Sequence, residues 1–396
     1  MKSLEIYVHI PFCMRKCEYC DFLSFPADDN TQFSYIKALL AEIRYYSPMF
    51  RNYTVTSIYI GGGTPSWLDA GLIAAVLSQI GKAYNVYPVA EVSIECNPGT
   101  VTEEKLRIYM NAGINRLSIG LQSPYDDELQ RLGRIHNFEQ FVRTYELSRN
   151  VGLKNINIDL MSGLPGQKPD KFVDGLHRVI RMKPEHLSVY SLIIEKGTPF
   201  YDKYKFDMVK QEAGMETEEL PTEDEVYRII KLTQHTLKEA GYIQYEISNF
   251  ARAGYECQHN VGYWTRADYL GLGLGAASLV ENVRYSNTRD LYEYIDGCAD
   301  IRDVGDEIFK SNLHQEANPV SRQAQMEEFM FLGLRMNSGV SRRKFEESFG
   351  IPIDGIYRQQ MDYLKEQGLL EMKEGRIYLT DKGMDLSNYC MEKFLL

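Results

Sequence analysis

Three of the seven cysteines, Cys13, Cys17 and Cys20, follow one another with the spacing C-x3-C-x2-C. The run EIYVHI at residues 5–10 predicts a strand just before them, so they belong to the loop after it. Structural zinc normally has a fourth Cys or His nearby, and His9 is available but lies inside the predicted strand. A redox pair needs only C-x2-C and would leave Cys13 unexplained. Three thiolates in one loop can instead hold three irons of a [4Fe–4S] cube and leave the fourth iron open to a small molecule.

Five further strand-like runs follow before residue 194, and helical patterns separate them. The runs VTSIYI, EVSIEC, RLSIGL, NINIDL and HLSVYS begin at residues 55, 91, 116, 155 and 186, and the helical patterns lie around 31–47, 70–84, 102–112, 138–151 and 170–182. The alternation predicts right-handed βαβ units and a parallel sheet. The fold class is therefore α/β, and six units predict a partial (β/α) barrel rather than a closed barrel of eight.

In such folds the chemistry lies at the C-terminal ends of the strands and in the loops that follow them. Several groups of polar residues and glycines in this chain directly follow the predicted strands. They include GGGTP at 61–65, Asn97, Gln122, Asp159 and GLPG at 163–166. We therefore expect one site at this end of the sheet.

The cysteine spacing after the first strand, with Tyr19 before the last cysteine, resembles the radical S-adenosylmethionine superfamily. In that superfamily the methionine amino and carboxylate groups chelate the open iron, and an electron from the cluster cleaves the sulfonium to a 5′-deoxyadenosyl radical. The runs YVHIPFC at 7–13, GGGTP at 61–65, LQS at 121–123, GRIH at 133–136 and DLMSGLPGQ at 159–167 are similar to the oxygen-independent coproporphyrinogen III oxidase family. That resemblance extends over nearly the whole chain and implies a [4Fe–4S] cluster and S-adenosylmethionine as cofactors.

The resemblance implies where the methionine part of S-adenosylmethionine binds. Gly62 and Gly63 would let the backbone approach the methionine ammonium, with Thr64 alongside. Glu95, at the end of a strand, would accept hydrogen bonds from the ammonium or from ribose hydroxyls. Arg134 would offer a planar fork to the methionine carboxylate.

The same resemblance places other residues around the nucleoside. Gln122 and Asp159 would hydrogen-bond the ribose, and Tyr7 would lie beside the sulfonium. Tyr19 and Ser191 would lie near the adenine. Each of these residue types is more often structural when it stands alone, and the prediction depends on their position after successive strands.

The segment CQHNVGYW at residues 257–264 combines a thiol, an imidazole and two large aromatic side chains. Histidine is a common axial ligand of haem, and Tyr and Trp supply flat apolar contact to a macrocycle, although an aromatic-rich loop is usually part of the core. In the family that the chain resembles, H-N-x-x-Y-W marks the haem-chaperone branch. His259, Asn260, Tyr263 and Trp264 complete this motif and imply haem as a third ligand.

The rest of the chain predicts supporting structure. We expect residues 203–225 to be a charged, solvated connection and 222–240 to be a helix, and we interpret the glycine-rich stretch at 271–276 as a turn or a packing segment. A helix near 322–336 and a helix followed by two short strands within 361–383 indicate a C-terminal α+β winged-helix-like domain. The predicted domains are a radical-SAM-type barrel at 1–200, a barrel extension with the haem motif at 201–316, and the winged-helix-like domain at 317–396.

Three features separate the chain from the decarboxylating dehydrogenase of the family. The first cysteine comes as early as residue 13, Phe22 stands where that enzyme has a fourth cysteine, and H-N-x-x-Y-W is present. They imply a haem chaperone that delivers haem to apo-haem proteins and takes an electron from a donor to its cluster. The alternatives are a coproporphyrinogen III dehydrogenase, which converts two propionates to vinyls, and a radical enzyme that modifies RNA. Whether the chain is an enzyme or a carrier stays open here.

Composition restricts the setting in which this chemistry takes place. The chain has 44 basic and 55 acidic residues, a net charge of −11, and no segment with the pattern of a signal peptide or a transmembrane span. The acidic balance argues against nucleic acid as a partner. We expect a cytoplasmic protein, or one peripheral at the membrane, because an open cluster needs a reducing compartment. Dimers occur in the family, so a homodimer is an implied assembly.

Overall fold

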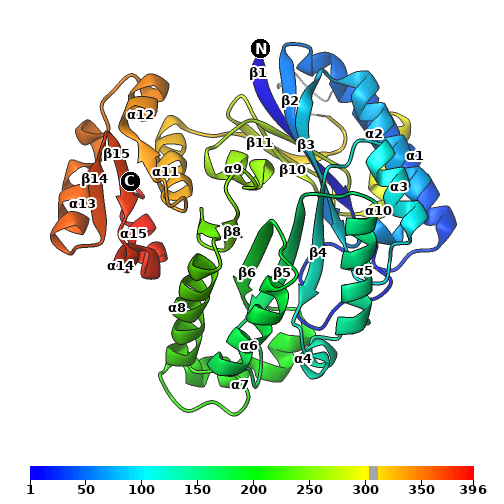
Figure 1. The fold of residues 1–396 in the computed structure, drawn as a ribbon. Coiled ribbons are helices and arrows are strands. Elements are labelled where there is room, and N and C mark those ends of the chain that lie inside the picture. Colours follow the sequence, from blue (N-terminus) through cyan, green and yellow to red (C-terminus); the bar gives the residue numbers. More distant parts are fainter. Residues whose placement is uncertain (303–310) are drawn as a thin grey trace.

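The computed structural model describes residues 1–302 and 311–396, and within them twelve strands form one sheet (Figure 1). Six of these strands pair in parallel in chain order. They are β1 (Lys2–Ile10), β2 (Tyr53–Gly62), β3 (Val86–Cys96), β4 (Arg116–Gln122), β5 (Ile156–Ser162) and β6 (His186–Ser191). The predicted six-unit partial barrel is confirmed.

Helices follow these strands and cover the outer side of the sheet (Figure 1). They are α1 (Asp29–Tyr46), α2 (Ala70–Ala83), α3 (Glu103–Asn111), α4 (Asp126–Arg131), α5 (Phe138–Asn150) and α6 (Pro169–Ile180), with the short 3-10 turns η1 (Ser47–Phe50) and η2 (Pro65–Trp67). Side chains of Asp28, Asp69, Thr102 and Asn137 accept hydrogen bonds from first-turn amides and so fix where four of these helices begin.

The two faces of the sheet differ sharply in polarity. On β1, Leu4, Ile6 and Val8 belong to the large apolar core beneath the helices. The alternate residues Glu5 and Tyr7 point to the opposite, inner face, because successive side chains of a strand alternate. The inner face is thus lined by polar and ionisable groups, and these are the groups that build the site.

The glycine-rich stretch does not form only the predicted turn. Its first part is a strand, β9 (Tyr269–Leu272), which pairs in parallel with β1. Gly271 is needed there because a Cβ would collide with the Ala277 carbonyl, and Gly273 has a positive φ of 101°. Antiparallel strands β10 (Ala277–Val280), β11 (Val283–Asn287) and β12 (His314–Pro319) extend this edge, and α10 (Leu291–Ala299) packs on α1.

The opposite edge continues from β6 to β8 (Asn249–Ala251) and β7 (Ile243–Gln244). Two helices precede these strands, α7 (Pro199–Glu212) and α8 (Glu223–Glu239). The predicted connection at 203–225 is therefore wrong over its first half, which is helical. Its second half folds back on α7, where Asp207 accepts hydrogen bonds from the backbone amides of Glu218, Glu219 and Leu220.

The C-terminal part has its own apolar core and a separate three-stranded sheet, ordered β13-β15-β14. Its elements are α11 (Arg322–Gly333), β13 (Val340–Ser341), α12 (Arg342–Phe349), α13 (Asp354–Glu366), β14 (Leu370–Lys373), β15 (Arg376–Leu379), α14 (Asp381–Asp385) and α15 (Ser387–Glu392). The predicted winged-helix-like order of helices and strands is confirmed. Among the described residues, none of the helices is both long and apolar enough to cross a membrane.

One short helix lies between the two parts. The segment predicted as an aromatic-rich loop is the helix α9 (Gln258–Trp264). Figure 1 shows α9 between the barrel strands and the C-terminal domain, and α9 contacts both β2 and α11. Its position brings the predicted haem motif to the inner face of the sheet.

Candidate functional site

The cysteine loop follows β1, and its far end at Phe25 folds back beside its beginning. The amide of Cys13 donates to the Phe25 carbonyl at 3.1 Å, and the Glu18 amide donates to the Leu132 carbonyl at 3.1 Å. All three cysteines are free thiols, Cys13 is buried, and burial is the main cause of the raised pKa of Cys13 and Cys20. Nearby cations therefore matter for holding these groups as thiolates.

A cation lies beside this loop. Arg134 Nη1 is 3.6 Å from Cys17 Sγ, and its Nη2 donates to Asn97 Oδ1 at 2.8 Å and to the Gly120 carbonyl at 2.7 Å. The Arg134 Nε is buried without a hydrogen-bond partner. A guanidinium fixed on two oxygens thus faces the thiols and keeps one unused donor, which suits an anionic group at this position.

The chemistry of the donor set, three free thiols in one loop, fits an iron–sulfur cluster. No group of three or more His, Cys, Asp or Glu within the described part of the chain converges on one ion position. A [4Fe–4S] cube does not require such convergence, because each thiolate binds a different iron. His9 is not a free fourth ligand, since Nε2 bonds the Leu23 carbonyl and Nδ1 bonds the Tyr7 hydroxyl.

The glycines after β2 approach the cysteine loop through their backbone. The amides of Gly63 and Thr64 donate to the carbonyls of Ile10 and Phe12, each at 2.8 Å. Gly62 has a positive φ of 114°, and a Cβ there would lie 2.6 Å from the His9 ring. The Thr64 hydroxyl lies 3.3 Å from Cys13 Sγ. The predicted glycines and Thr64 are therefore brought together with the cysteine loop.

Glu95 lies next to this turn on the inner face. Its Oε2 accepts from the Gly62 amide at 3.0 Å, and its Oε1 accepts from the Tyr59 hydroxyl at 3.1 Å. Burial, with Asp159 nearby as a second carboxylate, raises the pKa of Glu95 to about 7. A bound cation would favour its ionised form, so the carboxylate is well placed for an ammonium group.

The other predicted residues surround the same end of the barrel in different ways. Both carboxylate oxygens of Asp159 already accept hydrogen bonds, from Asn157 at 2.7 Å and from Ser118 at 3.1 Å. Gln122 ends β4 with a positive φ of 69°, which turns the chain away from the strand. Ser191 is exposed at the end of β6 and its hydroxyl lies 3.4 Å from that of Ser162.

The two predicted tyrosines lie on different sides of the site. Tyr7 is on the inner face of β1, with its ring centroid 6.4 Å from that of Tyr59 and its hydroxyl 3.0 Å from His9 Nδ1. Tyr19 lies in the cysteine loop and packs edge-on against Phe200 at 6.3 Å. Burial raises the pKa of both hydroxyls, and Cys17 and Cys20 also act on Tyr19. Both tyrosines are therefore neutral donors.

His259 of α9 lies inside the barrel. It is 1% exposed, Nδ1 lies 2.8 Å from the Ser57 hydroxyl, and Nε2 lies 3.2 Å from the Tyr263 hydroxyl. Its ring stacks on Tyr59 with centroids 5.2 Å apart and planes 23° apart. Burial lowers the pKa of His259 to about 3, so the ring is neutral and both nitrogens are engaged within the protein.

The other motif residues occupy the outer part of α9. Asn260, Tyr263 and Trp264 are half-buried. The Arg335 guanidinium lies 4.2 Å from the centre of the Trp264 ring, so the motif touches the segment after α11. The Trp264 Nε1 is buried and has no hydrogen-bond partner. The four predicted haem residues thus share one helix, in which His259 and Tyr263 contact each other while Trp264 faces Arg335.

Several residues of the site were missed by sequence reasoning. Tyr59 links Glu95 to His259, and Glu91 accepts from the Gln258 amide and the Cys257 thiol at 3.0 and 3.3 Å. Asn97, which the sequence already placed at this end of the sheet, accepts a hydrogen bond from Arg134. Arg116 is fully buried on the inner face near Glu91 and Cys257. A signal was available for Tyr59 and Glu91, because both alternate with apolar residues along predicted strands.

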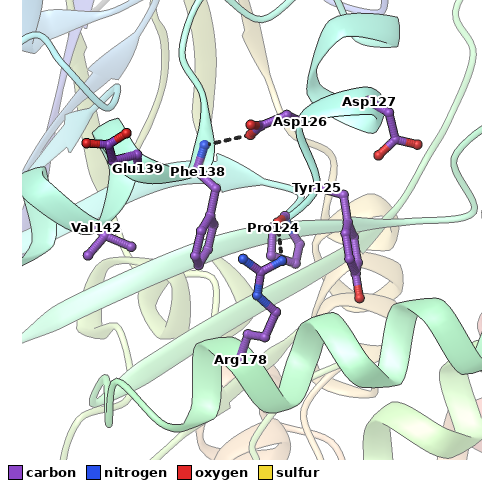
Figure 2. A pocket seen from close by; sticks show the side chains of 8 residues that line it. All are labelled: Pro124, Tyr125, Asp126, Asp127, Phe138, Glu139, Val142 and Arg178. Atoms are coloured by element: carbon purple, nitrogen blue, oxygen red, sulfur yellow. Dashed lines mark hydrogen bonds between the residues drawn. The ribbon is translucent and has the colours of Figure 1, made fainter.

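A large surface hollow lies elsewhere, between α4, α5 and α6. Figure 2 shows Arg178 in this hollow, where its guanidinium lies 4.1 Å from the Phe138 ring centre and donates to the Pro124 carbonyl at 2.7 Å. The cavity measures about 520 Å³, and none of the predicted site residues lines it. By contrast, Cys17, Thr64 and Arg134 line one narrow recess beside the cysteine loop.

Comparisons with known proteins agree with this arrangement. Residues 7–179 match the radical SAM superfamily, and residues 320–386 match the HemN C-terminal domain. The structure is similar to coproporphyrinogen III oxidase (HemN) from Escherichia coli, a radical SAM enzyme, with a TM-score of 0.81 and 23% identity over 100% of this chain and 90% of that one. At that identity the likeness establishes the fold alone.

Curated relatives match at higher identity and over full length. The heme chaperone HemW of Bacillus subtilis (strain 168) is 35% identical, with 100% of this chain and 99% of the relative covered. The heme chaperone HemW of Escherichia coli (strain K12) is 33% identical over the same shares of the two chains. This chain therefore belongs to the HemW family within the radical SAM superfamily.

Proposed function

We propose that this protein is a haem chaperone that binds haem, a [4Fe–4S] cluster and S-adenosylmethionine and delivers haem to apo-haem proteins. The observation that carries the proposal is the complete H-N-x-x-Y-W motif on α9, packed against the inner face of a radical-SAM-type barrel. Full-length similarity to proteins named heme chaperone supports it. Phe22, exposed in the cysteine loop, supports it further, because the decarboxylating dehydrogenase has a cysteine there.

The cofactor site follows from the residues already described. Cys13, Cys17 and Cys20 would hold the cluster, which supplies an electron and an open iron when it is bound. Gly62, Gly63, Thr64, Glu95 and Arg134 would receive the methionine part of S-adenosylmethionine, and Tyr7, Tyr19, Gln122, Asp159 and Ser191 would surround its nucleoside. The fixed Arg134 and the carboxylate of Glu95 give this site one charge of each sign, as a zwitterionic amino acid requires.

Haem would contact His259, Asn260, Tyr263 and Trp264. For His259 this requires a rearrangement, because an iron can reach Nε2 only if that nitrogen leaves the Tyr263 hydroxyl. Asn260 needs less change, since it is half-buried on α9, whereas the Trp264 ring must be released from the Arg335 guanidinium that covers it. We therefore propose that haem is received at α9 from the side of the C-terminal domain.

The proposed setting is the cytoplasm, with an electron donor to the cluster and respiratory haem proteins as recipients, and with a peripheral place at the membrane and a homodimer as further proposals. The net charge of −11 makes nucleic acid an unsuitable partner. These assignments depend on the haem motif and on the need of an open cluster for a reducing compartment.

Anaerobic haem titration of the reconstituted protein, followed by absorption, tests the proposal. We expect one haem per chain, weakened at least tenfold by His259→Ala and unchanged by His235→Ala, a control on an exposed histidine of α8. In parallel, Cys17→Ala should lose iron and acid-labile sulfide, whereas Cys298→Ala, in α10, should retain both. Equal haem affinity in wild type and His259→Ala would remove His259 from the haem site.

The same preparation tests the enzyme alternative. Incubation with coproporphyrinogen III, S-adenosylmethionine and a reductant should leave the substrate unchanged. Formation of protoporphyrinogen would contradict the chaperone proposal and establish the decarboxylating activity instead.

A further inference from the structure

Tyr59 joins the two ligand regions of the protein. Its hydroxyl donates to Glu95 Oε1 at 3.1 Å, next to the glycine turn after β2. Its ring stacks on His259 of α9 with centroids 5.2 Å apart. One side chain on β2 therefore contacts both the carboxylate proposed for S-adenosylmethionine and the histidine proposed for haem.

His259 is held firmly in the position that supports Tyr59. Ser57, two residues before Tyr59 on the same inner face, bonds His259 Nδ1 at 2.8 Å, and Tyr263 bonds Nε2 at 3.2 Å. The backbone of α9 is fixed too, since Glu91 accepts from the Gln258 amide at 3.0 Å. We call this arrangement, with His259 stacked on Tyr59, the seated state.

The seated state is incompatible with iron binding at His259. The side chain is 1% exposed, and no haem can approach a ring that is stacked on one side and bonded at both nitrogens. A haem iron bound to Nε2 requires a withdrawn state, because the buried ring must move toward the surface and thereby leaves both the Tyr263 hydroxyl and the face of Tyr59. The Tyr59 ring then loses the packing partner that covers this face, while its hydroxyl is the group that bonds Glu95.

We propose that Tyr59 is a positioning residue that holds Glu95 for S-adenosylmethionine only in the seated state, so that S-adenosylmethionine and haem oppose each other's binding. This inference rests on the proposed function and adds to it the sign of the coupling between the two ligands. S-adenosylmethionine favours the seated state and haem favours the withdrawn state, so each ligand lowers the affinity of the other by the same factor. Binding of S-adenosylmethionine thereby promotes the release of haem from α9.

The conservative variant Tyr59→Phe separates the two contacts of Tyr59. It removes the hydroxyl that bonds Glu95 and keeps the ring that stacks on His259. The matched control is Tyr109→Phe, because the Tyr109 hydroxyl is buried on α3 in the outer layer and has no hydrogen-bond partner. Thermal unfolding of both variants checks that the fold is retained.

Two binding measurements on anaerobically reconstituted protein test the inference. S-adenosylmethionine affinity is measured by equilibrium dialysis with and without haem, and haem affinity is measured by absorption with and without S-adenosylmethionine. In wild type we expect each ligand to weaken the other roughly fivefold or more. Tyr59→Phe should weaken S-adenosylmethionine binding about fivefold and change haem affinity by no more than about twofold. In this variant neither ligand should affect the affinity of the other. Tyr109→Phe should behave as wild type.

The outcomes distinguish this inference from the proposed function. If wild type fails to bind haem or S-adenosylmethionine, the proposed function is wrong. If wild type binds both but the ligands are independent or help each other, the opposition proposed here is overturned. If Tyr59→Phe keeps the wild-type mutual effect, Tyr59 does not transmit it.

Discussion

Ionisable residues are concentrated on the inner face of the barrel, where water is largely excluded. Glu5, Glu91, Glu95 and Asp159 lie there with one fully buried cation, Arg116. Burial, reinforced by Glu91, raises the pKa of Glu5 to about 9, while burial lowers the pKa of His259 to about 3. Glu5 Oε2 and His259 Nδ1 are 3.8 Å apart, yet at neutral pH both groups are uncharged and form no ion pair. Glu5, Glu91 and Arg116 are not among the proposed ligand contacts, and they set the electrostatic surroundings of Glu95 and His259, which are.

Glu5→Gln tests this electrostatic description. Because the folded-state pKa of Glu5 lies above its unfolded value of 4.5, its contribution to stability is complete below about pH 4.5 and is lost as pH rises through about 9. Gln mimics the protonated carboxyl and does not titrate, so the variant should match wild type in melting temperature at about pH 4 and exceed it by a growing margin as the pH rises to about 9. Thermal unfolding across this range measures the difference, and identical profiles for both proteins would show that Glu5 is ionised in the fold.

At the scale of elements, the sequence predicts the parts whose pattern is local and misses those fixed by distant contacts. The strands β1–β6 and the helices α1, α2, α3, α5 and α6 carry clear periodicities and were predictable, as was the cysteine loop between β1 and α1, whereas the six-residue α4 was not predicted. The helix α9 spans only 258–264, too short for a periodic signal. Its place inside the barrel depends on the bond between Ser57 and His259, which are 202 residues apart. The strand β9 was missed because glycine is rare in strands.

Gly262→Ala tests whether the close packing of α9 against β1 matters for function. A Cβ at Gly262 would collide with the Glu5 carboxyl, so the substitution should push α9 away from β1 without changing any residue of the motif. We expect a loss of stability of roughly 1–3 kcal/mol and altered haem affinity. Gly81→Ala, in α2, is the control, because a Cβ there meets nothing within 4 Å and should stabilise the helix by about 0.5–1 kcal/mol. Equal effects of the two variants would contradict the packing described for α9.

At the scale of the whole molecule, the C-terminal domain is joined to the barrel through charged contacts next to α9. Glu328 of α11 accepts from Arg266 at 2.8 Å and from Arg284 at 2.9 Å, and Arg335 pairs with Glu246 at 3.8 Å while covering Trp264. The helix that carries the haem motif therefore contacts both the barrel and the C-terminal domain. The sequence indicated a separate C-terminal domain but not the contacts that join it to the barrel, because these ion pairs form between segments with no shared pattern.

Glu328→Ala tests this joint. Arg266 would remain 13% exposed without its carboxylate, so we expect a loss of roughly 2–3 kcal/mol, less than for a fully buried pair because Arg284 is half-exposed. Hydrogen exchange should increase in α9 and α11 together. Glu347→Ala breaks the exposed pair with Arg343 and should cost no more than about 0.5 kcal/mol. Unchanged exchange in α9 after Glu328→Ala would show that the joint does not support the motif helix.

Haem transfer is the measurement that tests the central claim most directly. Haem-loaded protein is mixed anaerobically with the apo form of a respiratory b-type haem protein, and the absorption spectrum of the recipient is followed in time. The account predicts that the recipient acquires haem faster than from haem alone, and that the wild-type advantage is lost in His259→Ala. Transfer no faster than from free haem, or an undiminished rate in that variant, would contradict it.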